Sequence, residues 1–493
     1  MSVFSRLYRI PLPELLLFSL ASLLLLSCTP QQSAGPQQTS DRGLDAVIAD
    51  MTLEEKIGQL FMPNISATFY NNDDPHFQQI SKRITEYHVG SLALFGGDPY
   101  EAARNIERFQ RMADRPLLIA ADFEWGIPMR FSAGTRFPEN MGIGATRSVE
   151  LAYQQGVITA REARALGIHV NFAPVMDVNN NPDNPIINVR SYSEDPLLVS
   201  KLGTAFIRGV QSQNMAATAK HYPGHGDTDL DSHLRLPVID VSRDRLDSLE
   251  LVPFKAAVES GVRVIMAAHL ALPKVTGDNE PASLSPYVIQ HILRDSLQYD
   301  GVVVTDAMMM GGIREGYYPG EAAVKAIQAG VDIIVYPSDF ELAYQTVLEA
   351  VQEKRIPIDR INESVRRILR LKRFVRVDEN RYPDFETAEE VVANPEFDRW
   401  SDDAFRRAIT LVKNEDNVLP MDAGAIDSMV TIVITDNIDY GFPGDRFVSK
   451  INTKINYNRV FRVAPNSSDS LLIEARAVVK KADAAVIGVF VRF

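Results

Sequence analysis

Short apolar runs alternate along most of the chain with longer stretches whose apolar residues recur at helical spacing, as in Glu150–Leu166 and Pro196–Gln213. A helix start is indicated near the beginning of this pattern, because Thr52 and Glu55 have the spacing of a capping box. The short runs predicted as β-strands are Gln59–Pro63, Ser91–Phe95, Pro116–Asp122, His169–Asp177, Ala216–His221, Val262–His269, Gly301–Asp306 and Asp332–Pro337. Repeated strand–helix alternation predicts an α/β fold with a parallel sheet, in the form of a (β/α)8 TIM barrel; a doubly wound sheet is the alternative.

Many of these strands end on a polar or ionisable residue: Asp122, Asp177, Lys220–His221, His269 and Asp306. In a barrel the carboxyl ends of the strands converge on one mouth, where active sites lie. A doubly wound sheet would instead spread them along a crevice. The strand ends therefore favour the barrel, and they favour an enzyme over a scaffold.

The pattern weakens after Arg373 and resumes as a second α/β segment, with strands predicted at Ile409–Lys413, Thr431–Thr435 and Ala484–Val491 and a helix at Ser470–Lys481. Three strands without closing elements predict an incomplete C-terminal α/β sandwich domain. The predicted boundaries are a signal peptide at 1–28, a flexible tether rich in Gln, Ser and Pro at 29–44, the barrel at 45–375, a linker at 376–398 and the partial domain at 399–493.

The first 28 residues have the pattern of an export signal. Arg6 and Arg9 precede the apolar run Leu15–Leu26, which is too short for a membrane-spanning helix of about 20 residues. The closing tetrad Leu25-Leu26-Ser27-Cys28 resembles the lipobox of bacterial lipoproteins, in which the cysteine is acylated. We therefore expect a protein exported and lipid-anchored to the bacterial cell envelope (periplasm or outer membrane), touching the membrane through that anchor only. An ordinary signal peptide with a chance cysteine is the alternative.

Composition narrows the classes of partner. The 493 residues are 45% hydrophobic and 23% charged, so the chain can bury large cores. The formal net charge of −13 argues against nucleic acid as a partner, because such binding needs a dense basic face. Cys28 is the single cysteine, which excludes an intrachain disulfide and a Cys-based zinc site.

Three of the eight histidines fall between His221 and His233, in a strand end that becomes a loop rich in Gly and Pro. Lys220, His221 and His225 are clustered donors suited to gripping hydroxyls. Asp231 and His233 are two residues apart and point the same way in an extended loop, so the carboxylate can orient the imidazole for proton transfer. Zinc is a competing interpretation, but the helical H-E-x-x-H spacing is absent. A solvated loop without chemistry is the other alternative.

A second candidate lies at the end of the buried-type strand Gly301–Asp306, which is followed by small residues and by Gly311 and Gly312. A carboxylate at a barrel mouth, with little bulk after it, suits a nucleophile that a ligand must approach closely. The alternative is that Asp306 only caps the next helix. Beside the His/Asp loop, the nucleophile is favoured.

Two further clusters have the composition of ligand grips. Asp122 ends a strand, with Trp125 and Arg130 close after it, and a carboxylate beside an aromatic ring is typical of sugar recognition. Trp125 is equally compatible with a place in the core. Arg190 lies in a loop expected at the same mouth, and its alternative role is a salt bridge to an acidic residue at 194–195.

Taken together, these motifs resemble glycoside hydrolase family 3, in its bacterial β-N-acetylglucosaminidase (β-N-acetylhexosaminidase) subgroup, over roughly Asp45 to Arg373. The matching segments, in chain order, are Asn171-Phe-Ala-Pro-Val-Met-Asp177, Arg190-Ser-Tyr-Ser-Glu-Asp-Pro196, Lys220-His221-Tyr-Pro-Gly-His225-Gly-Asp-Thr with Asp231-Ser-His233, and Val-Thr-Asp306-Ala-Met. Four ordered motifs are much more specific than one. Where the subgroup commonly has Asp-Gln-Glu-Gly-Gly, this chain has Asp122-Phe-Glu-Trp-Gly126, a departure that bears on the preference for the leaving group.

The resemblance implies a retaining exo-β-N-acetylhexosaminidase that acts on terminal N-acetylglucosamine of a glycan or a muropeptide-like amino-sugar substrate. Asp306 would be the nucleophile, and His233 supported by Asp231 the acid/base, in place of the usual second carboxylic acid. The residues expected to bind the sugar are Asp122, Arg130, Arg190, Lys220 and His221, together with His225. No cofactor and no metal is implied. The alternatives are a β-glucosidase-type enzyme of the same family and a non-catalytic sugar-binding envelope lipoprotein.

Overall fold

The computed structural model describes residues 43–436 and 444–490. The predicted signal peptide, nearly all of the predicted tether and Cys28 lie outside the described residues.

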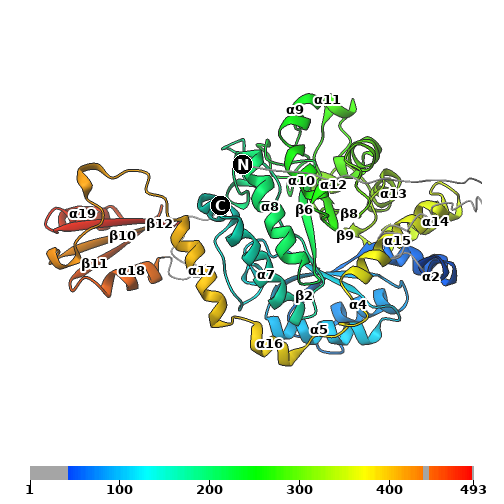
Figure 1. The fold of residues 1–493 in the computed structure, drawn as a ribbon, viewed down its shortest axis with the longest axis horizontal. Helices are drawn as coiled ribbons and strands as arrows, with labels where there is room; N and C mark the ends of the chain where they lie inside the picture. Colours follow the sequence, from blue (N-terminus) through cyan, green and yellow to red (C-terminus); the bar gives the residue numbers. More distant parts are fainter. Residues whose placement is uncertain (1–42, 437–443, 491–493) are drawn as a thin grey trace, which may run out of the picture. The chain divides into compact units, whose positions relative to one another are not determined.

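The larger part of the described chain is built on parallel strands (Figure 1). Seven of them form one sheet in chain order: β2 (Asn64–Ala67), β3 (Ser91–Gly97), β4 (Leu118–Ala121), β5 (Val170–Asn171), β6 (Ala216–Tyr222), β7 (Val264–Ala267) and β8 (Val302–Thr305). A second, two-stranded parallel sheet pairs β1 (Phe61–Met62) with β9 (Ile334–Val335).

Main-chain hydrogen bonds connect the two sheets. The Thr305 N–H donates to the Ile333 carbonyl (3.1 Å), just before β9, and the Ala93 N–H of β3 donates to the Pro63 carbonyl (2.9 Å), between β1 and β2. The parallel α/β arrangement is confirmed, and each of the eight predicted runs contains a strand. The sequence did not predict β2 as a separate strand; β1 pairs with β9 and β2 with β3, and this change of partner falls at Pro63, whose carbonyl already faces β3.

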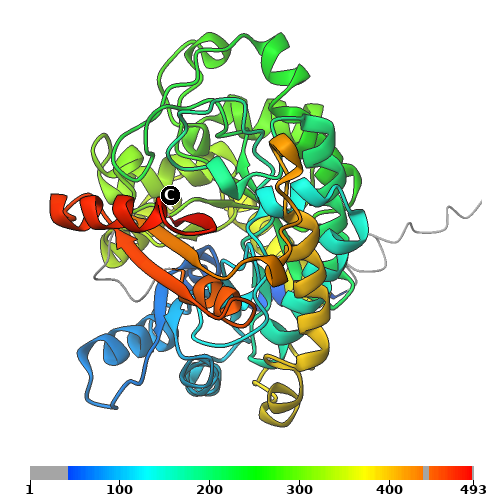
Figure 2. The same cartoon turned by 90° about the vertical axis from the view of Figure 1, so that its left-hand side faces the viewer.

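Helices form an outer layer around the sheet (Figure 2). Their bounds are α2 Leu44–Asp50, α3 Leu53–Gln59, α4 Pro75–Thr85, α5 Pro99–Met112, α6 Asn140–Thr146, α7 Val149–Ala165, α8 Pro196–Gln211, α9 Arg243–Ser248, α10 Leu251–Glu259, α11 Pro273–Thr276, the π-helix η4 Tyr287–Ser296, α12 Gly311–Arg314, α13 Pro319–Ala329, α14 Phe340–Gln352 and α15 Ile358–Phe374. Short 3-10 turns lie at Ile127–Met129 (η1), Asn188–Arg190 (η2) and Ala282–Leu284 (η3).

Several of these helices begin where the local sequence dictates. The predicted capping box is present, since the Glu55 N–H donates to Thr52 Oγ1 (3.2 Å) and the Thr52 N–H donates to Glu55 Oε2 (2.9 Å). Helices α4, α5 and α8 each begin with proline after an aspartate whose side chain caps the first turn. The strands β4, β7 and β8 are buried at every position, as expected of parallel strands covered by helices.

The C-terminal segment forms a separate small sheet, with β10 (Met429–Thr435) between β11 (Asn458–Val463) and β12 (Ala484–Phe490), all parallel. Its helices are α18 (Asp445–Asn452) and α19 (Asp469–Val479), and α19 packs Ala475 against Val430 and Phe461. The predictions of the strands at 431–435 and 484–491 and of the helix at 470–481 are confirmed over the described residues.

One prediction for this part of the chain is wrong. Residues 409–413 are not a strand; Val412 is 91% exposed and none of the described strands pairs with this run. The predicted linker contains helix α16 (Phe385–Val391) and the start of α17 (Pro395–Ala408), and further 3-10 turns lie at Glu415–Asn417 (η5) and Ala423–Ala425 (η6). The α16–α17 junction is tied to α7, because the Ala393 N–H donates to the buried Glu162 carboxylate (2.9 Å).

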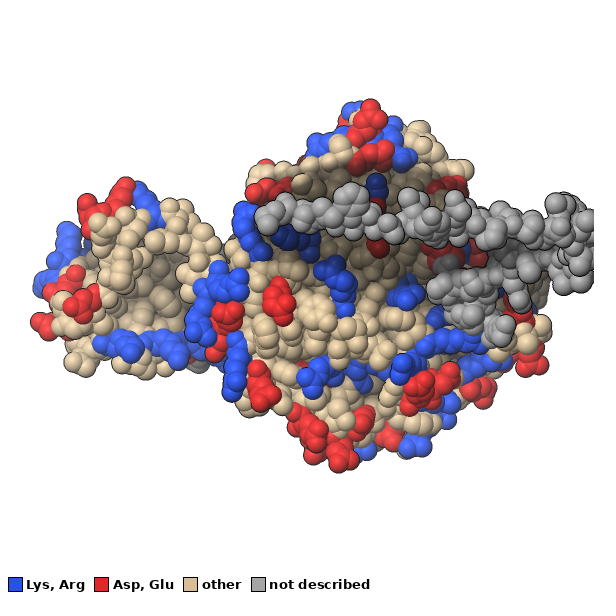
Figure 3. Space-filling view, viewed as in Figure 1, with Lys and Arg blue, Asp and Glu red and all other residues tan. Residues whose placement is uncertain are grey.

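The described surface is mixed in charge. Lys and Arg side chains intermingle with Asp and Glu over the face in Figure 3. Over residues 43–436 and 444–490, no helix has the length and apolar character that crossing a membrane requires.

Candidate active site

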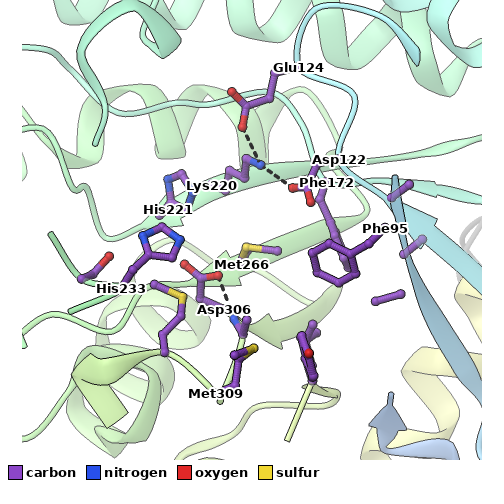
Figure 4. Close-up of a pocket in the computed structure, with 18 of the residues that line it drawn as sticks. Phe95, Asp122, Glu124, Phe172, Lys220, His221, His233, Met266, Asp306 and Met309 are labelled. Atoms are coloured by element: carbon purple, nitrogen blue, oxygen red, sulfur yellow. Dashed lines mark hydrogen bonds and ion pairs between the residues drawn. The ribbon is translucent and has the colours of Figure 1, made fainter. Parts of the chain in front are cut away.

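A cavity of about 430 Å³ opens at the carboxyl ends of the parallel strands (Figure 4). Eight of the predicted site residues line it: Asp122, Arg130, Arg190, Lys220, His221, His225, His233 and Asp306. The ninth, Asp231, contacts His233. Residues that the sequence places up to almost 200 positions apart therefore share one cavity, as the convergence of strand ends requires.

A cluster of two carboxylates and three cations forms one side of the cavity. Lys220 Nζ lies 2.8 Å from Asp122 Oδ1 and 2.8 Å from Glu124 Oε1. Arg130 contacts the other oxygen of Asp122 (2.6 Å), and Arg190 donates to both oxygens of Glu124 (2.7 and 3.0 Å). Side-chain exposure is 2% for Lys220 and 0% for Glu124, so these contacts are shielded from water.

The cluster keeps its two carboxylates, Asp122 and Glu124, ionised. Burial alone would raise the pKa of Glu124, but Arg190 and Lys220 outweigh it and lower that pKa far below its usual value. Burial likewise opposes ionisation of Asp122, and Lys220 and Arg130 lower its pKa. The result is a rigid array of charged donors and acceptors facing the cavity, which suits several hydroxyl groups held at once.

A register shift in β6 presents two of the cavity residues. Pairing with β7 is regular up to Ala219 and resumes at Tyr222, so Lys220 and His221 lie at the irregularity. Behind them, buried Asp177 accepts hydrogen bonds from His221 Nδ1 (2.7 Å) and from the His225 N–H (2.7 Å). Asp177 thus fixes both the ring of His221 and the first turn of the loop after β6.

His225 lies deep in the wall of the cavity. Burial lowers its pKa to about 4, so the ring is neutral at pH 7. Its Nδ1 is 3.1 Å from the Thr228 hydroxyl, whereas its buried Nε2 has no hydrogen-bond partner among the described residues.

The predicted His/Asp pair is in contact at the edge of the cavity. His233 Nδ1 donates to Asp231 Oδ1 (2.8 Å), which also accepts the His233 N–H (2.8 Å). The His233 side chain is 60% exposed. With Nδ1 held by the carboxylate, Nε2 is left to exchange a proton with a ligand.

Asp306 follows β8 directly and lies in the floor of the cavity, with His233 nearby in Figure 4. Burial would raise its pKa, but His221, His269 and the Ala307 N–H (2.8 Å to Oδ1) outweigh burial and lower it. Asp306 is therefore ionised at neutral pH. It is not the cap of the next helix, which begins at Gly311 with Met310 as its N-cap.

The other ionisable strand ends lie behind the cavity. His269 is fully buried between the Ser283 hydroxyl (2.8 Å) and the Ala307 carbonyl (3.2 Å), and burial lowers its pKa. It supports the segment that follows Asp306, just as Asp177 supports His221. The convergence of strand ends thus supplies both the cavity and the layer behind it.

Sequence reasoning missed Glu124, and the alternative role that it left open for Arg190 is wrong. Arg190 pairs with Glu124 and not with an acidic residue at 194–195. Trp125 is half-buried and is not among the residues that line the cavity, which favours its alternative place in the core over a sugar-stacking ring. The signal that was missed is the pair of carboxylates, Asp122 and Glu124, on either side of buried Phe123. Both carboxylates contact cations on other elements.

Apolar side chains and a tyrosine complete the wall, among them Phe95, Phe172, Met266, Met309 and Tyr336. Arg314, at the end of α12, also lines the cavity. The part of the chain that the structure describes contains no group of three or more His, Cys, Asp or Glu side chains arranged to hold a metal ion.

Comparison with known proteins gives consistent similarities. Residues 52–371 match the family described as "Glycosyl hydrolase family 3 N terminal domain". The chain is 34% identical over 376 residues to a protein named beta-hexosaminidase A from Pseudoalteromonas piscicida, an alignment that covers 70% of this chain and 62% of that protein. It is 30% identical over 401 residues to a beta-N-acetylglucosaminidase/beta-glucosidase from Cellulomonas fimi, covering 79% of this chain and 70% of that protein.

Among solved structures, a glycoside hydrolase family 3 beta-N-acetylglucosaminidase from Paenibacillus sp. str. FPU-7 superposes with a TM-score of 0.78 at 34% identity. The superposition covers 89% of this chain and 84% of that structure.

Proposed function

This chain belongs to glycosyl hydrolase family 3, and we propose that it is a retaining exo-β-N-acetylhexosaminidase that hydrolyses terminal N-acetylglucosamine from glycans. The proposal rests on one observation above all: an ionised carboxylate, Asp306, shares a cavity with the His233–Asp231 pair. The names of the relatives in Pseudoalteromonas, Cellulomonas and Paenibacillus support the amino sugar as substrate. In this proposal the two parallel sheets, which main-chain hydrogen bonds connect, together form the predicted (β/α)8 barrel.

In the first step, Asp306 attacks the anomeric carbon and forms a covalent glycosyl-enzyme, while His233 donates a proton to the departing glycosidic oxygen. Asp231 orients the imidazole of His233 through the hydrogen bond at Nδ1 (2.8 Å), which leaves Nε2 to carry the transferred proton. The low pKa of Asp306 keeps this carboxylate ionised and ready to attack.

In the second step, water replaces the departed leaving group. His233, now neutral, accepts a proton from this water, whose oxygen attacks the anomeric carbon and releases Asp306. Two displacements on the same carbon retain its configuration. Carboxylate, imidazole and water suffice for this route, so no cofactor enters the proposal.

The non-reducing sugar is bound, in this proposal, by the charged cluster of Asp122, Arg130, Arg190 and Lys220 and by His221 beside it. His221 Nε2 lies 3.4 Å from Arg190 Nη2, so both can reach the same hydroxyl. Because Lys220 and Glu124 are almost fully buried, their charges act without competition from bulk water.

The deciding experiment compares hydrolysis of 4-nitrophenyl N-acetyl-β-glucosaminide with that of 4-nitrophenyl β-glucoside. We expect kcat/KM to be much higher for the amino sugar. Equal rates would instead favour the β-glucosidase alternative, since the relative from Cellulomonas fimi is named for both activities. Turnover of neither substrate, with binding of N-acetylglucosamine retained, would favour the non-catalytic sugar-binding protein.

A second assay tests the nucleophile. Asp306→Ala should abolish turnover of the amino-sugar substrate and leave sugar binding in place, since the binding cluster does not include Asp306. Undiminished activity of this variant would refute the assignment.

We further propose that the protein is exported and anchored to the cell envelope through a lipid on Cys28. The support is the sequence of the first 28 residues. Metabolic labelling with a fatty-acid analogue, with Cys28→Ala as the control, tests this; labelling that persists in Cys28→Ala would contradict it.

A further inference from the structure

The segment between Asp306 and α12 has a contact that the proposed chemistry does not use. Helix α12 (Gly311–Arg314) has no side-chain cap, so the first N–H groups of the helix need other acceptors. The Gly311 N–H donates to the His233 carbonyl (3.0 Å), and the Gly312 N–H donates to the Ser232 carbonyl (3.1 Å). The loop that carries His233 therefore caps the helix that follows Asp306.

These two hydrogen bonds are the main attachment of the end of the loop. The first half of the loop is held elsewhere, since Asn184 Nδ2 donates to the carbonyls of His225 and Gly226 (2.8 and 2.9 Å). For residues 229–235, the described chain shows hydrogen bonds within the loop and, beyond the loop, only those from Gly311 and Gly312. His233 is also largely exposed, so packing does little to hold its position.

The contact is close enough to require glycine. A Cβ on Gly311 would lie 2.2 Å from the Leu234 carbonyl oxygen and 2.8 Å from that of His233, so the loop would have to move. A Cβ on Gly312 would lie 3.3 Å from the Ser232 oxygen and also 3.3 Å from the Cβ and the carbonyl oxygen of His269, which needs only a small adjustment. Gly316, a few residues on, has nothing within 4 Å of such a Cβ.

The segment is also fixed at its other end. The Met308 N–H donates to the Val335 carbonyl (2.9 Å) of β9, and the Asp306 N–H donates to the Ala267 carbonyl (2.9 Å) of β7. A short piece of chain, held by the sheet, thus runs from Asp306 to the loop that carries His233.

We propose that Gly311 is a positioning residue that sets the place of His233 relative to Asp306 through this backbone contact. The inference rests on the proposed function, because it takes His233 as the acid that protonates the leaving group. Displacing the loop should impair that proton transfer and spare both the sugar-binding cluster and the nucleophile.

The test is the dependence of rate on the leaving group. Gly311→Ala should lower kcat/KM about ten-fold or more for phenyl N-acetyl-β-glucosaminide, whose leaving group needs protonation, and less than about three-fold for the 4-nitrophenyl glycoside, because small misplacements of a catalytic group are costly only where that group acts. Gly312→Ala should show the same selectivity more weakly. Gly316→Ala, the matched control, should behave as the wild type.

A double-mutant cycle separates positioning from a general structural role. In the His233→Ala background, adding Gly311→Ala should have no further effect on either substrate, because the group it positions is gone. An equal loss on both substrates, or the same loss with and without His233, would overturn the proposal. If Gly311→Ala does not fold, the cycle is run with Gly312→Ala, and an unselective loss there counts against it as well.

The outcomes for the two proposals remain distinct. Failure of the wild type to hydrolyse N-acetyl-β-glucosaminides would refute the proposed function. Hydrolysis by the wild type together with an unselective Gly311→Ala variant would refute only the positioning role.

Discussion

At the scale of single residues, Glu124 is the cavity residue that depends most on its charged partners. Its carboxylate accepts both branches of Arg190 and contacts Lys220, with no exposed side-chain surface. Buried charges stabilise a fold only when each has its partner. Removing one of them leaves the others buried without a compensating charge.

Glu124→Gln should therefore lower the free energy of unfolding by about 3 kcal/mol. It should also raise KM more than it lowers kcat, because Arg190 and Lys220 lose their common anchor while Asp306 and His233 keep their contacts. Urea unfolding and steady-state kinetics measure the two effects. Glu194→Gln is the matched control, since the exposed Glu194 is the partner that sequence proximity suggested for Arg190; a larger effect there than at Glu124 would contradict the observed pairing.

At the scale of elements, the loop after β6 is organised by one carboxylate from the segment after β5. Asp177 accepts from the His221 and His225 N–H groups and from the His221 ring, and burial opposes its charge while His221 lowers its pKa. An amide at this position has one acceptor fewer and directs N–H groups at donors.

Asp177→Asn should thus destabilise the fold by about 2–4 kcal/mol, comparable to breaking a buried charged contact. It should reduce kcat/KM on good and poor leaving groups alike, because His221 and the first turn of the loop move while His233 stays attached to α12, in contrast to the selective loss expected of Gly311→Ala. Asp183→Asn, in an exposed part of the neighbouring loop, serves as the control. A leaving-group-selective effect of Asp177→Asn would show that this carboxylate acts on His233 alone.

The elements themselves were predictable where local signals decide them. Capping residues followed by proline mark helix starts such as Pro196, and apolar runs mark all eight predicted strands. The strand predicted at 409–413 failed because a strand exists only with a partner, and partner choice is not local. The separation of β2 from β1 is a change of partner strand at Pro63, from β9 to β3, which is likewise not a local property.

Asp122, Lys220 and Asp306 could be predicted as site residues because each lies at the end of a predicted strand and has an ionisable side chain. Glu124 was missed because its role is set by Arg190, 66 residues away in the chain, and by the register shift that turns Lys220 toward it. Likewise, the contact between the His233 loop and α12 depends on how two loops meet in space. Such contacts require the three-dimensional arrangement, since no spacing in the sequence encodes them.

At the scale of the whole molecule, the buried cation Lys372 connects global stability to pH. It lies on α15, is 4% exposed, and its Nζ donates to Gln59 Oε1 (2.7 Å) at the end of α3. Burial lowers its pKa to about 7; Arg115 and Arg381 act in the same direction, and Asp378 opposes them.

The sign of the pH dependence follows from this lowered pKa. Between about pH 7 and the ordinary lysine value near 10.4, the unfolded chain holds a proton on Lys372 that the folded chain has released. The contribution of Lys372 to the free energy of unfolding therefore rises with pH across that window, by at most about 1.4 kcal/mol per pH unit, and does not change with pH below the window.

Lys372→Met lacks this titration, so the free energy of unfolding of the wild type minus that of the variant should increase from pH 7.5 to pH 9.5. Urea unfolding of both proteins at the two pH values measures the difference, and Lys201→Met, which removes an exposed lysine on α8, controls for the loss of a positive charge. A difference that stays constant or falls over this range would mean that Lys372 is not held with a lowered pKa in the folded protein.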